Sequence, residues 1–215
     1  FKKIILIERE FNLGLSKNIV SGIDHVLREN NSVIVLEDDI LTSKFFLKFM
    51  NDALTTYESS KNVCQISGYS YLEKYSNKYE LDETYFIKGG DCMAWGTWKS
   101  SWNLFTEDAQ YLYDQIKQKK LDRLFNRSNS YNYLKMLKAR AAEKNQSWAI
   151  CWYAVNFLKN KYTFYPLKTF ARHIGNDKDA TNYIPSNKDA LNVNLNDKKV
   201  KVLKINVLEK INTKL

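Results

Sequence analysis

The stretch SVIVLEDDILTS, residues 32–43, places four aliphatic side chains, Val33–Leu36, directly before three acids, Glu37, Asp38 and Asp39. A short run that is apolar on consecutive residues is typical of a strand buried on both faces, as in a parallel sheet. Three adjacent carboxylates repel one another unless a positive group lies among them, and oxygen donors suit a hard cation such as Mg²⁺ or Mn²⁺. The stretch therefore predicts a buried strand that ends at a ligand or metal site.

The segments on either side of this stretch alternate between strand and helix patterns. KKIILIERE predicts a strand that ends near Glu8, and residues 17–29 have apolar side chains at helical spacing after a turn at Gly14. Thr42 or Ser43 can cap a second helix, and NVCQISGYS predicts a third strand. This alternation predicts an α/β fold with a mostly parallel, Rossmann-like sheet flanked by helices. Ligands bind such sheets beyond the carboxyl ends of the strands, which is where the three acids lie.

The second half of the chain is less regular. TYFIKGGDCMAWGTWKSSW predicts a short strand, a Gly-Gly turn and a cluster of three tryptophans, and helical patterns follow at 108–119, 131–144 and 147–158. The last of these is apolar almost all round, so we expect it to be buried. KYTFYPLKTFARHIG predicts a strand that Pro166 stops, followed by a loop. Residues 200–211 fit an edge strand and an amphipathic helix equally.

Composition limits the class of protein. A chain of 215 residues that is 44% apolar and 14% aromatic can bury a core, and it has no apolar run near the roughly 20 residues of a membrane-spanning helix. Three separated cysteines predict neither a zinc site nor a disulfide framework, so a reducing cytoplasm is expected. The net charge of +9 comes from scattered lysines, which disfavours nucleic acid. The same charge suits a phosphorylated ligand or peripheral association with the inner face of a membrane.

The ordered segments of this chain resemble the bacterial sugar-nucleotide glycosyltransferases of the GT-A fold, and most of all the branch related to N-acetylglucosaminyltransferase I. The matching text runs from Glu8 to Gly175 and comprises ERE with NLGLSKNIVSGI, VIVLEDDILTSKFFLKFMNDALTTY, QISGYS, YFIKGGDCMAWGTWKSSW, SWAICWYAVNFLKN and FYPLKTFARHIG. The ordered set is far more specific than EDD alone. The resemblance implies a glycosyltransferase domain over 1–185, followed by a Lys/Asn-rich extension over 186–215.

The resemblance also implies an activity. Members of the family transfer a hexosyl group from a nucleotide-diphosphate sugar to a glycan acceptor, here expected in surface polysaccharide biosynthesis. Their E-D-D motif implies that Asp39 ligates Mn²⁺ or Mg²⁺, while Glu37 and Asp38 face the nucleotide sugar. The cation would neutralise the charge that develops on the leaving diphosphate. By spacing alone, the same acids also fit solvated turn residues or the first charges of the following helix.

Further site residues are implied by the same resemblance. Arg9 and Asn12, in R-x-x-N-x-G, match the loop near the nucleotide, although Arg9 also fits a surface ion pair. The GGD-x-x-AWGTW segment resembles the loop that lines the donor and acceptor pocket, where Trp95 is the candidate for contact with the apolar face of a sugar. Trp98 and Trp102 are expected in the core, since large aromatic side chains are usually buried.

The chain departs from the family where a catalytic base is expected. The family places an aspartate just before the helix that begins with SW, whereas Gln146 or Ser147 stands here, and neither accepts a proton at neutral pH. Glu143, one helical turn earlier, is the substitute candidate. Asn182 replaces a family histidine, and His173 replaces a family asparagine and is expected to be an ordinary loop histidine.

The N-terminus also departs from the family, because the strands that hold the nucleobase would precede Phe1. We therefore expect a GT-A domain that is truncated at its N-terminus, with an exposed sheet edge at 4–7 through which copies could form a homo-oligomer. A catalytically deficient binding or assembly protein of the same fold is the alternative. A metal phosphohydrolase or nuclease has little support, since no second acidic or histidine cluster is present.

Overall fold

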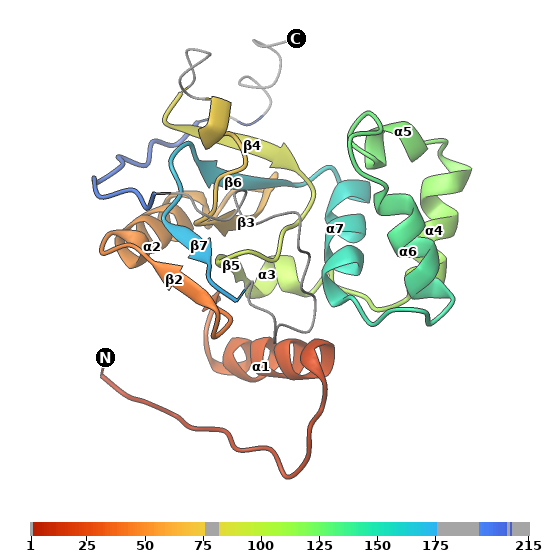
Figure 1. Cartoon of the computed structure of the whole chain (residues 1–215), viewed down its shortest axis with the longest axis horizontal. Coiled ribbons are helices and arrows are strands. Elements are labelled where there is room, and N and C mark those ends of the chain that lie inside the picture. Colours follow the sequence, from red (N-terminus) through yellow and green to blue (C-terminus); the bar gives the residue numbers. More distant parts are fainter. Residues whose placement is uncertain (1, 76–81, 176–193, 206, 208–215) are drawn as a thin grey trace.

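The fold is mixed α/β, with a five-stranded sheet and a separate two-stranded sheet. The computed structural model of the chain describes residues 2–75, 82–175, 194–205 and 207. The large sheet has the order β1-β5-β3-β6-β4, and the small sheet pairs β2 with β7 (Figure 1). The strands are β1 (Ser32–Val35), β2 (Ile40–Thr42), β3 (Val63–Ser67), β4 (Thr84–Lys88), β5 (Trp95–Trp98), β6 (Tyr162–Pro166) and β7 (Ala171–His173).

The large sheet is mostly antiparallel, so the prediction of a mostly parallel, Rossmann-like sheet was wrong. Only β3 and β6 pair in parallel, whereas β5 runs antiparallel to both β1 and β3, and β4 runs antiparallel to β6. Of the three strands on which the prediction rested, the N-terminal one does not form, and β1 and β3 share one direction although they are not neighbours. The short strand β5 lies between β1 and β3. The prediction failed because burial on both faces of a strand reports the layers above and below it, and not the direction of its neighbours.

Seven α-helices are found among the described residues. They are α1 (Leu15–Glu29), α2 (Phe46–Tyr57), α3 (Lys99–Trp102), α4 (Ala109–Gln118), α5 (Asp122–Phe125), α6 (Tyr133–Ala141) and α7 (Trp148–Leu158), and a 3₁₀ turn spans Glu73–Tyr75. The helices predicted around 17–29, 108–119 and 147–158 are confirmed within two residues. None of the described helices is long and apolar enough to cross a membrane.

Helix α6 ends three residues before the predicted limit at Lys144, for a local reason. Glu143 has a positive φ of 56°, and the backbone N–H of Lys144 donates to the carbonyl of Ala139 at 2.8 Å. The N–H of Glu143 donates to Arg140 at 3.1 Å, which completes a Schellman termination. Glu143 is therefore an exposed residue of the turn after the helix.

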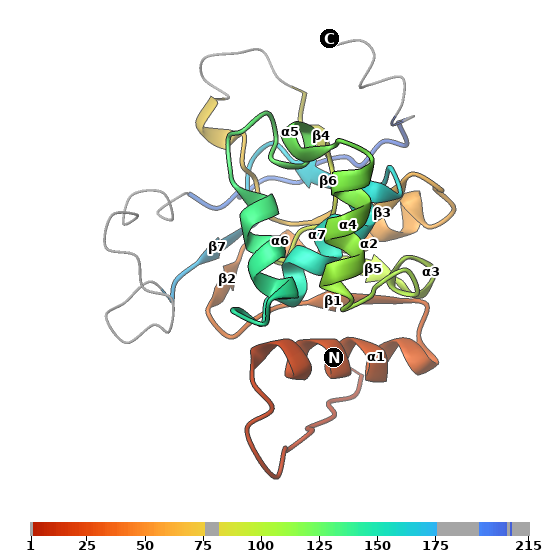
Figure 2. The ribbon, with the colours of Figure 1, turned by 90° about the vertical axis from the view of Figure 1, so that its right-hand side faces the viewer.

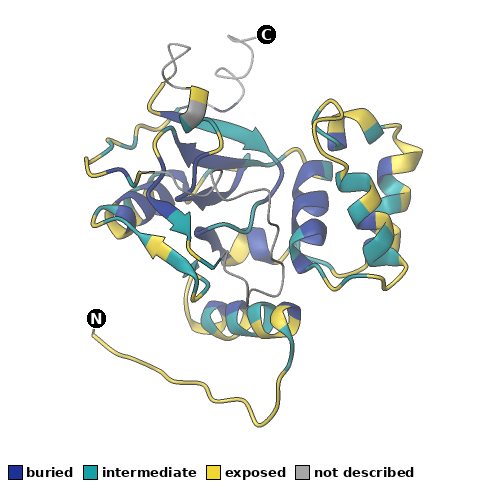
Figure 3. Ribbon diagram, viewed as in Figure 1, coloured by how far each residue is buried: buried dark blue, intermediate teal, exposed yellow. Residues whose placement is uncertain are grey.

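Two apolar clusters pack on the two faces of the large sheet. One cluster joins α2 to Ile66 of β3 and Phe164 of β6, and Val207 from the C-terminal tail completes it. The other cluster joins α7 to α4, α6 and a group of four tryptophans. Helix α7 lies between the sheet and α4 with α6, and it is buried along most of its length (Figures 1, 2 and 3).

The N-terminal segment forms no strand, which corrects the prediction for KKIILIERE and for a sheet edge at 4–7. Ile4 is 84% exposed and Leu6 is 80% exposed, and the segment extends away from the rest of the chain (Figure 3). A strand requires a hydrogen-bonding neighbour, and none of the described strands lies beside this segment. Its aliphatic residues therefore lack the sheet that their pattern favoured.

The described part of the C-terminal tail packs back on the domain without regular structure at 194–205. The N–H of Asn196 donates to Thr169, and the hydroxyl of Tyr57 donates to the carbonyl of Leu203 at 2.8 Å. Residues 200–205 form neither the strand nor the helix that their pattern allowed. The division of the chain at residue 185 stays a prediction.

Candidate functional site

Three loops leave the large sheet at one edge. Trp95, the first residue of β5, pairs with Val35 at the end of β1 and with Ser67 at the end of β3. The acidic turn at 36–39, the loop after Ser67 and the segment at 89–94 are therefore neighbours at this edge. The N–H of Gly68 donates to the carbonyl of Ala94 at 2.8 Å, which joins two of these loops directly.

The last acid of the turn, Asp39, is paired with a histidine from a distant part of the sequence. Pairing of β2 with β7 brings Ile40 opposite His173, and the N–H of Ile174 donates to the carbonyl of Asp39 at 2.8 Å. Nε2 of His173 lies 2.8 Å from Oδ2 of Asp39. The expectation of an ordinary loop histidine was therefore wrong, because His173 belongs to a strand and contacts the predicted metal ligand.

Each partner of this pair keeps one polar atom without a hydrogen-bond partner. Oδ1 of Asp39 and Nδ1 of His173 are both buried, and neither contacts a donor or acceptor among the described residues. Buried polar atoms are nearly always paired, so two orphans at one site leave polar groups that a bound ligand or ion would satisfy. Gly175 packs closely on Asp39, because a Cβ at this position would lie only 2.6 Å from Oδ2 of Asp39.

The other two acids differ in their surroundings. Asp38 is exposed, while Glu37 is half-buried. Burial raises the pKa of Glu37, and the charges of Asp39 and Asp38 raise it further, while His173 lowers it. The repulsion expected of three adjacent carboxylates is therefore present, and a bound cation would relieve it.

The described residues supply only part of a metal site. No group of three or more histidine, cysteine or acidic side chains is gathered at metal-binding spacing in the described ranges. Mg²⁺ is commonly held by one or two carboxylates, with substrate phosphates and water at the other positions. Oδ1 of Asp39 fits the role of a single protein ligand, and the remaining ligands would have to come from the substrate and solvent.

The R-x-x-N-x-G loop folds onto the start of α1. Arg9 donates to Oγ of Ser21 at 3.0 Å and to Oδ1 of Asn18 at 3.4 Å, so its partners are neutral side chains. The surface ion pair that was also considered is not found among the described residues. Oδ1 of Asn12 accepts from the N–H of Gly14 at 2.8 Å, which forms the turn before the helix. Both residues are exposed and are held close to α1.

Two of the three candidates for the catalytic base lie at the start of α7. Gln146 is exposed, and its Oε1 lies 3.8 Å from the position of a Cβ on Gly14, so the structure brings this residue beside the R-x-x-N-x-G loop. Ser147 is the N-cap of α7, where its Oγ accepts from the N–H of Ile150 at 3.3 Å. Neither has the chemistry of a base, and Glu143 lies in the exposed turn described above.

Trp95 is part of the core and offers no open face to a sugar. It is 1% exposed, and its ring stacks on Trp148 with 5.5 Å between centroids. Trp102 and Trp152 lie at 6.0 and 5.9 Å from it. The indole of Trp95 is thus enclosed by three others, and the proposed contact with a ligand does not fit this position. Trp98 and Trp102 are 4% and 6% exposed, so their assignment to the core is confirmed.

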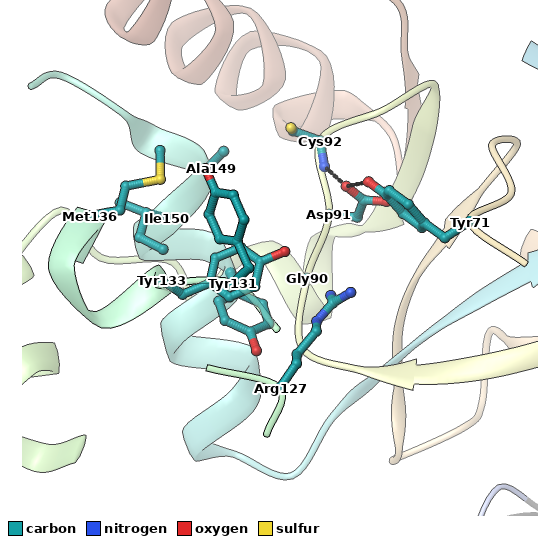
Figure 4. A pocket seen from close by; sticks show the side chains of 11 residues that line it. Tyr71, Gly90, Asp91, Cys92, Arg127, Tyr131, Tyr133, Met136, Ala149 and Ile150 are labelled. Carbon is teal, nitrogen blue, oxygen red and sulfur yellow. Dashed lines mark hydrogen bonds between the residues drawn. The ribbon is translucent and has the colours of Figure 1, made fainter. Parts of the chain in front are cut away.

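A pocket that was not foreseen as a site lies between the segment at 89–94, the start of α7 and the loop before α6. Its volume is about 240 Å³. Four tyrosines, one carboxylate and one guanidinium line it, namely Tyr71, Tyr131, Tyr133, Tyr153, Asp91 and Arg127. Figure 4 shows Arg127 pointing toward Asp91, which is joined by hydrogen bonds to Tyr71 and to the backbone of Cys92.

Asp91 is held in place by a polar face of the sheet. Three fully buried residues donate from this face to backbone carbonyls of the irregular segment: Gln65 to Asp91 at 3.1 Å, Ser67 to Met93 at 2.9 Å and Thr163 to Gly89 at 2.6 Å. An irregular segment on a sheet has no ladder partners, so side chains must satisfy its carbonyls. The acid of GGD and the polar residues within the predicted strand VCQIS were the only sequence signals for this arrangement.

Comparisons with known proteins add no evidence about this site. No family model matches the chain, and no curated protein is significantly similar to it.

Proposed function

We propose that this chain carries a metal-dependent glycosyltransferase activity that moves a sugar from a nucleotide-diphosphate sugar to a glycan acceptor, as its resemblance to GT-A enzymes implies. The observation that carries the proposal is the buried, unpartnered Oδ1 of Asp39 at the sheet edge where the acidic turn and the 89–94 segment meet. Surface polysaccharide biosynthesis is the proposed setting.

Asp39 would bind Mn²⁺ or Mg²⁺ through Oδ1, since Oδ2 is already paired with His173. When bound, the cation supplies neutralisation of the negative charge that grows on the leaving diphosphate. His173 and the backbone of Ile174 orient Asp39 from the opposite strand. Glu37 would place a second carboxylate next to the nucleotide sugar.

The alternative, a catalytically deficient protein that binds a nucleotide sugar, is favoured by one specific observation. The position where the family has its base is occupied by Gln146 or Ser147. Neither is a base, the Oγ of Ser147 is engaged as a helix cap, and the nearby Glu143 lies in an exposed turn. This alternative keeps the donor site and drops the transfer step, so both proposals predict binding of metal and nucleotide.

Thermal unfolding with Mn²⁺ and a panel of UDP, GDP, CMP and dTDP species tests the donor site. A ligand at 100 times its Kd stabilises the folded state by about 2.7 kcal/mol, which corresponds to a rise of roughly 5–10 °C in Tm for a chain of this size. We expect a rise that needs both the metal and one nucleotide, and that disappears in Asp39→Asn.

Asp52→Asn is the matched control, because Asp52 lies on α2 and pairs only with Lys48 on the surface. The control variant should keep the full rise in Tm. The absence of a rise for every pair of metal and nucleotide would contradict both forms of the proposal. Transfer of the sugar, measured with the nucleotide that passes this test, then separates the enzyme from the binding protein.

A further inference from the structure

The pocket around Asp91 has the size and chemistry of a site for one small polar ring. Its volume of about 240 Å³ lies below the range of roughly 300–1,000 Å³ that is typical of drug-sized ligands. Met136, Ala149 and Ile150 give it an apolar wall, and the tyrosines give it aromatic faces with hydroxyl groups at their rims. Tyr71 and Tyr131 are 40% and 58% exposed, so they stand at its mouth.

Asp91 keeps capacity to accept one more hydrogen bond. An ionised carboxylate offers about four acceptor positions. Three donors fill positions on Asp91: the N–H of Cys92 at 2.7 Å and the hydroxyl of Tyr71 at 3.2 Å on Oδ1, and the hydroxyl of Tyr165 at 2.9 Å on Oδ2. The remaining position on Oδ2 is available to a ligand in the pocket.

Arg127 supplies a positive group on the other side of the pocket. Its guanidinium lies over the rings of Tyr133 and Tyr153, at 5.4 and 5.5 Å from their centroids, and its Nε is buried without a partner. The ion pairs of the described residues do not include Arg127 with Asp91. The two opposite charges therefore share the pocket without cancelling each other through direct contact.

The loop that presents Arg127 adopts a costly backbone conformation. Arg127, Ser128 and Asn129 have φ values of 48°, 55° and 69°, in the left-handed region that non-glycine residues avoid. Such residues cost roughly 1–2 kcal/mol each and cluster at functional sites. The backbone is therefore strained at the point where the loop holds the guanidinium of Arg127 beside the pocket.

A neutral ring with several hydroxyl groups satisfies both charged groups at once. A hydroxyl can donate to Asp91, and another can accept from Arg127, whereas an anion would be repelled by the first group and a cation by the second. The C–H face of a sugar can also lie against tyrosine rings. These features together select a neutral pyranose over a singly charged ligand.

We propose that this pocket binds one pyranose ring of the acceptor, and that Asp91 is the catalytic base that takes the proton of the attacking hydroxyl. The acceptor oxygen forms its bond to the anomeric carbon of the donor sugar while its proton passes to Oδ2 of Asp91. The bond between that carbon and the diphosphate oxygen breaks, and its electron pair leaves with the nucleoside diphosphate. Asp91 afterwards releases the proton to solvent.

The neighbourhood of Asp91 suits this role. Burial raises the pKa of its carboxyl group, although the hydrogen bonds from Cys92 and Tyr165 and the charge of Arg127 lower it in part. A base works best when its pKa approaches the working pH. Asp91 also reaches the pocket that Ala149 and Ile150 of α7 line, close to the position where the family carries its aspartate.

The binding step can be tested without any donor, which separates it from the proposed function on which the catalytic step rests. Saturation-transfer NMR would use methyl glucoside, methyl galactoside and N-acetylglucosamine as probes, with serine as a zwitterionic comparison. We expect signals from at least one sugar on the wild-type chain. They should weaken at least about 10-fold in Asp91→Asn and in Ala149→Phe, which fills the pocket and leaves the carboxylate of Asp91 in the chain.

Asp114→Asn is the matched control, since Asp114 lies on the exposed face of α4 and accepts only from Gln110. It should bind the sugars as the wild type does. If Asp91→Asn fails to fold, Tyr71→Phe removes one hydroxyl from Oδ1 and should weaken binding as well. Absence of all sugar signals on the folded wild type, or signals from serine alone, would overturn the proposal.

The catalytic step is tested with the nucleotide sugar that the thermal experiment identifies. Asp91→Asn should lower kcat at least about 100-fold, which is the usual minimum for losing a general base, while the rise in Tm with metal and nucleotide is unchanged. A kcat within threefold of wild type would refute the role of Asp91. If no nucleotide binds, the proposed function fails, and the sugar-binding experiment still decides whether the pocket is a site.

Discussion

Replacement of Gln65 by leucine tests whether the polar face of the sheet holds the segment that carries Asp91. Gln65 is fully buried in β3, donates to the carbonyl of Asp91 at 3.1 Å, and accepts from Nε1 of Trp152. Leucine has a similar volume, so the change leaves no large cavity and removes only polar chemistry. Two buried groups, the carbonyl of Asp91 and the indole N–H of Trp152, would lose their partners.

The size of the effect follows from these two groups. An unsatisfied buried donor or acceptor costs about 1–3 kcal/mol, so Gln65→Leu should lower the free energy of unfolding by roughly 2–6 kcal/mol. For a chain of this length, each kcal/mol lowers Tm by about 2–4 °C, and a loss near the middle of the range corresponds to a fall of roughly 10 °C. Urea unfolding and thermal unfolding, both followed by circular dichroism, measure these two quantities.

Gln118→Leu is the matched control, because Gln118 is exposed at the end of α4 and accepts only a long hydrogen bond of 3.4 Å from Gln115. Surface substitutions of this kind usually change stability by less than about 0.5 kcal/mol. If Gln65→Leu is also within about 1 kcal/mol of wild type, the hydrogen bonds from the sheet do not hold the segment, and the preorganisation of Asp91 must have another cause.

Two further predictions concern other parts of the structure. In Gly175→Ala, the new Cβ would lie 2.6 Å from Oδ2 of Asp39 where ordinary contacts begin at 3.4 Å, so the carboxylate must move by about 0.8 Å. Metal-dependent nucleotide binding, measured by titration calorimetry, should therefore weaken by an order of magnitude or more. Unchanged affinity would show that the position of Asp39 is unimportant. Burial raises the pKa of Cys64 from 9.0 to about 12. The unfolded chain therefore loses this proton at a lower pH than the folded chain does, and stability should fall as the pH rises above 9. A Cys64→Ala variant should show a smaller fall in Tm between pH 8 and 10, and an equal fall would exclude the thiol as a cause.

Much of the local structure could be predicted from the sequence, because it depends on residues that are close together in the chain. The apolar period of α1 and the continuous apolar face of α7 report burial directly. The acids after β1 mark the end of a strand, and Asp39 does carry a buried oxygen without a hydrogen-bond partner among the described residues. These features required no knowledge of what packs against them.

Sheet order and the composition of the site could not be predicted in this way. The insertion of β5 between β1 and β3 depends on pairings across long stretches of chain, and no local pattern states which edge a strand joins. Trp95 looks the same in sequence whether its ring faces a ligand or three other tryptophans, and only packing decides between them. The N-terminal aliphatic run has the pattern of a strand and has no strand partner among the described residues.

The sequence by itself determined the helices α1, α4 and α7 to within two residues, and that three carboxylates follow a strand, which proves to be a half-buried edge strand. Only the tertiary structure brought His173 to Asp39, and Arg127 with four tyrosines to Asp91. The physical reason is that helix period and strand burial are set by neighbouring side chains, whereas a site is built from groups far apart in the chain. Their meeting depends on which strands pair and which loops the sheet can hold.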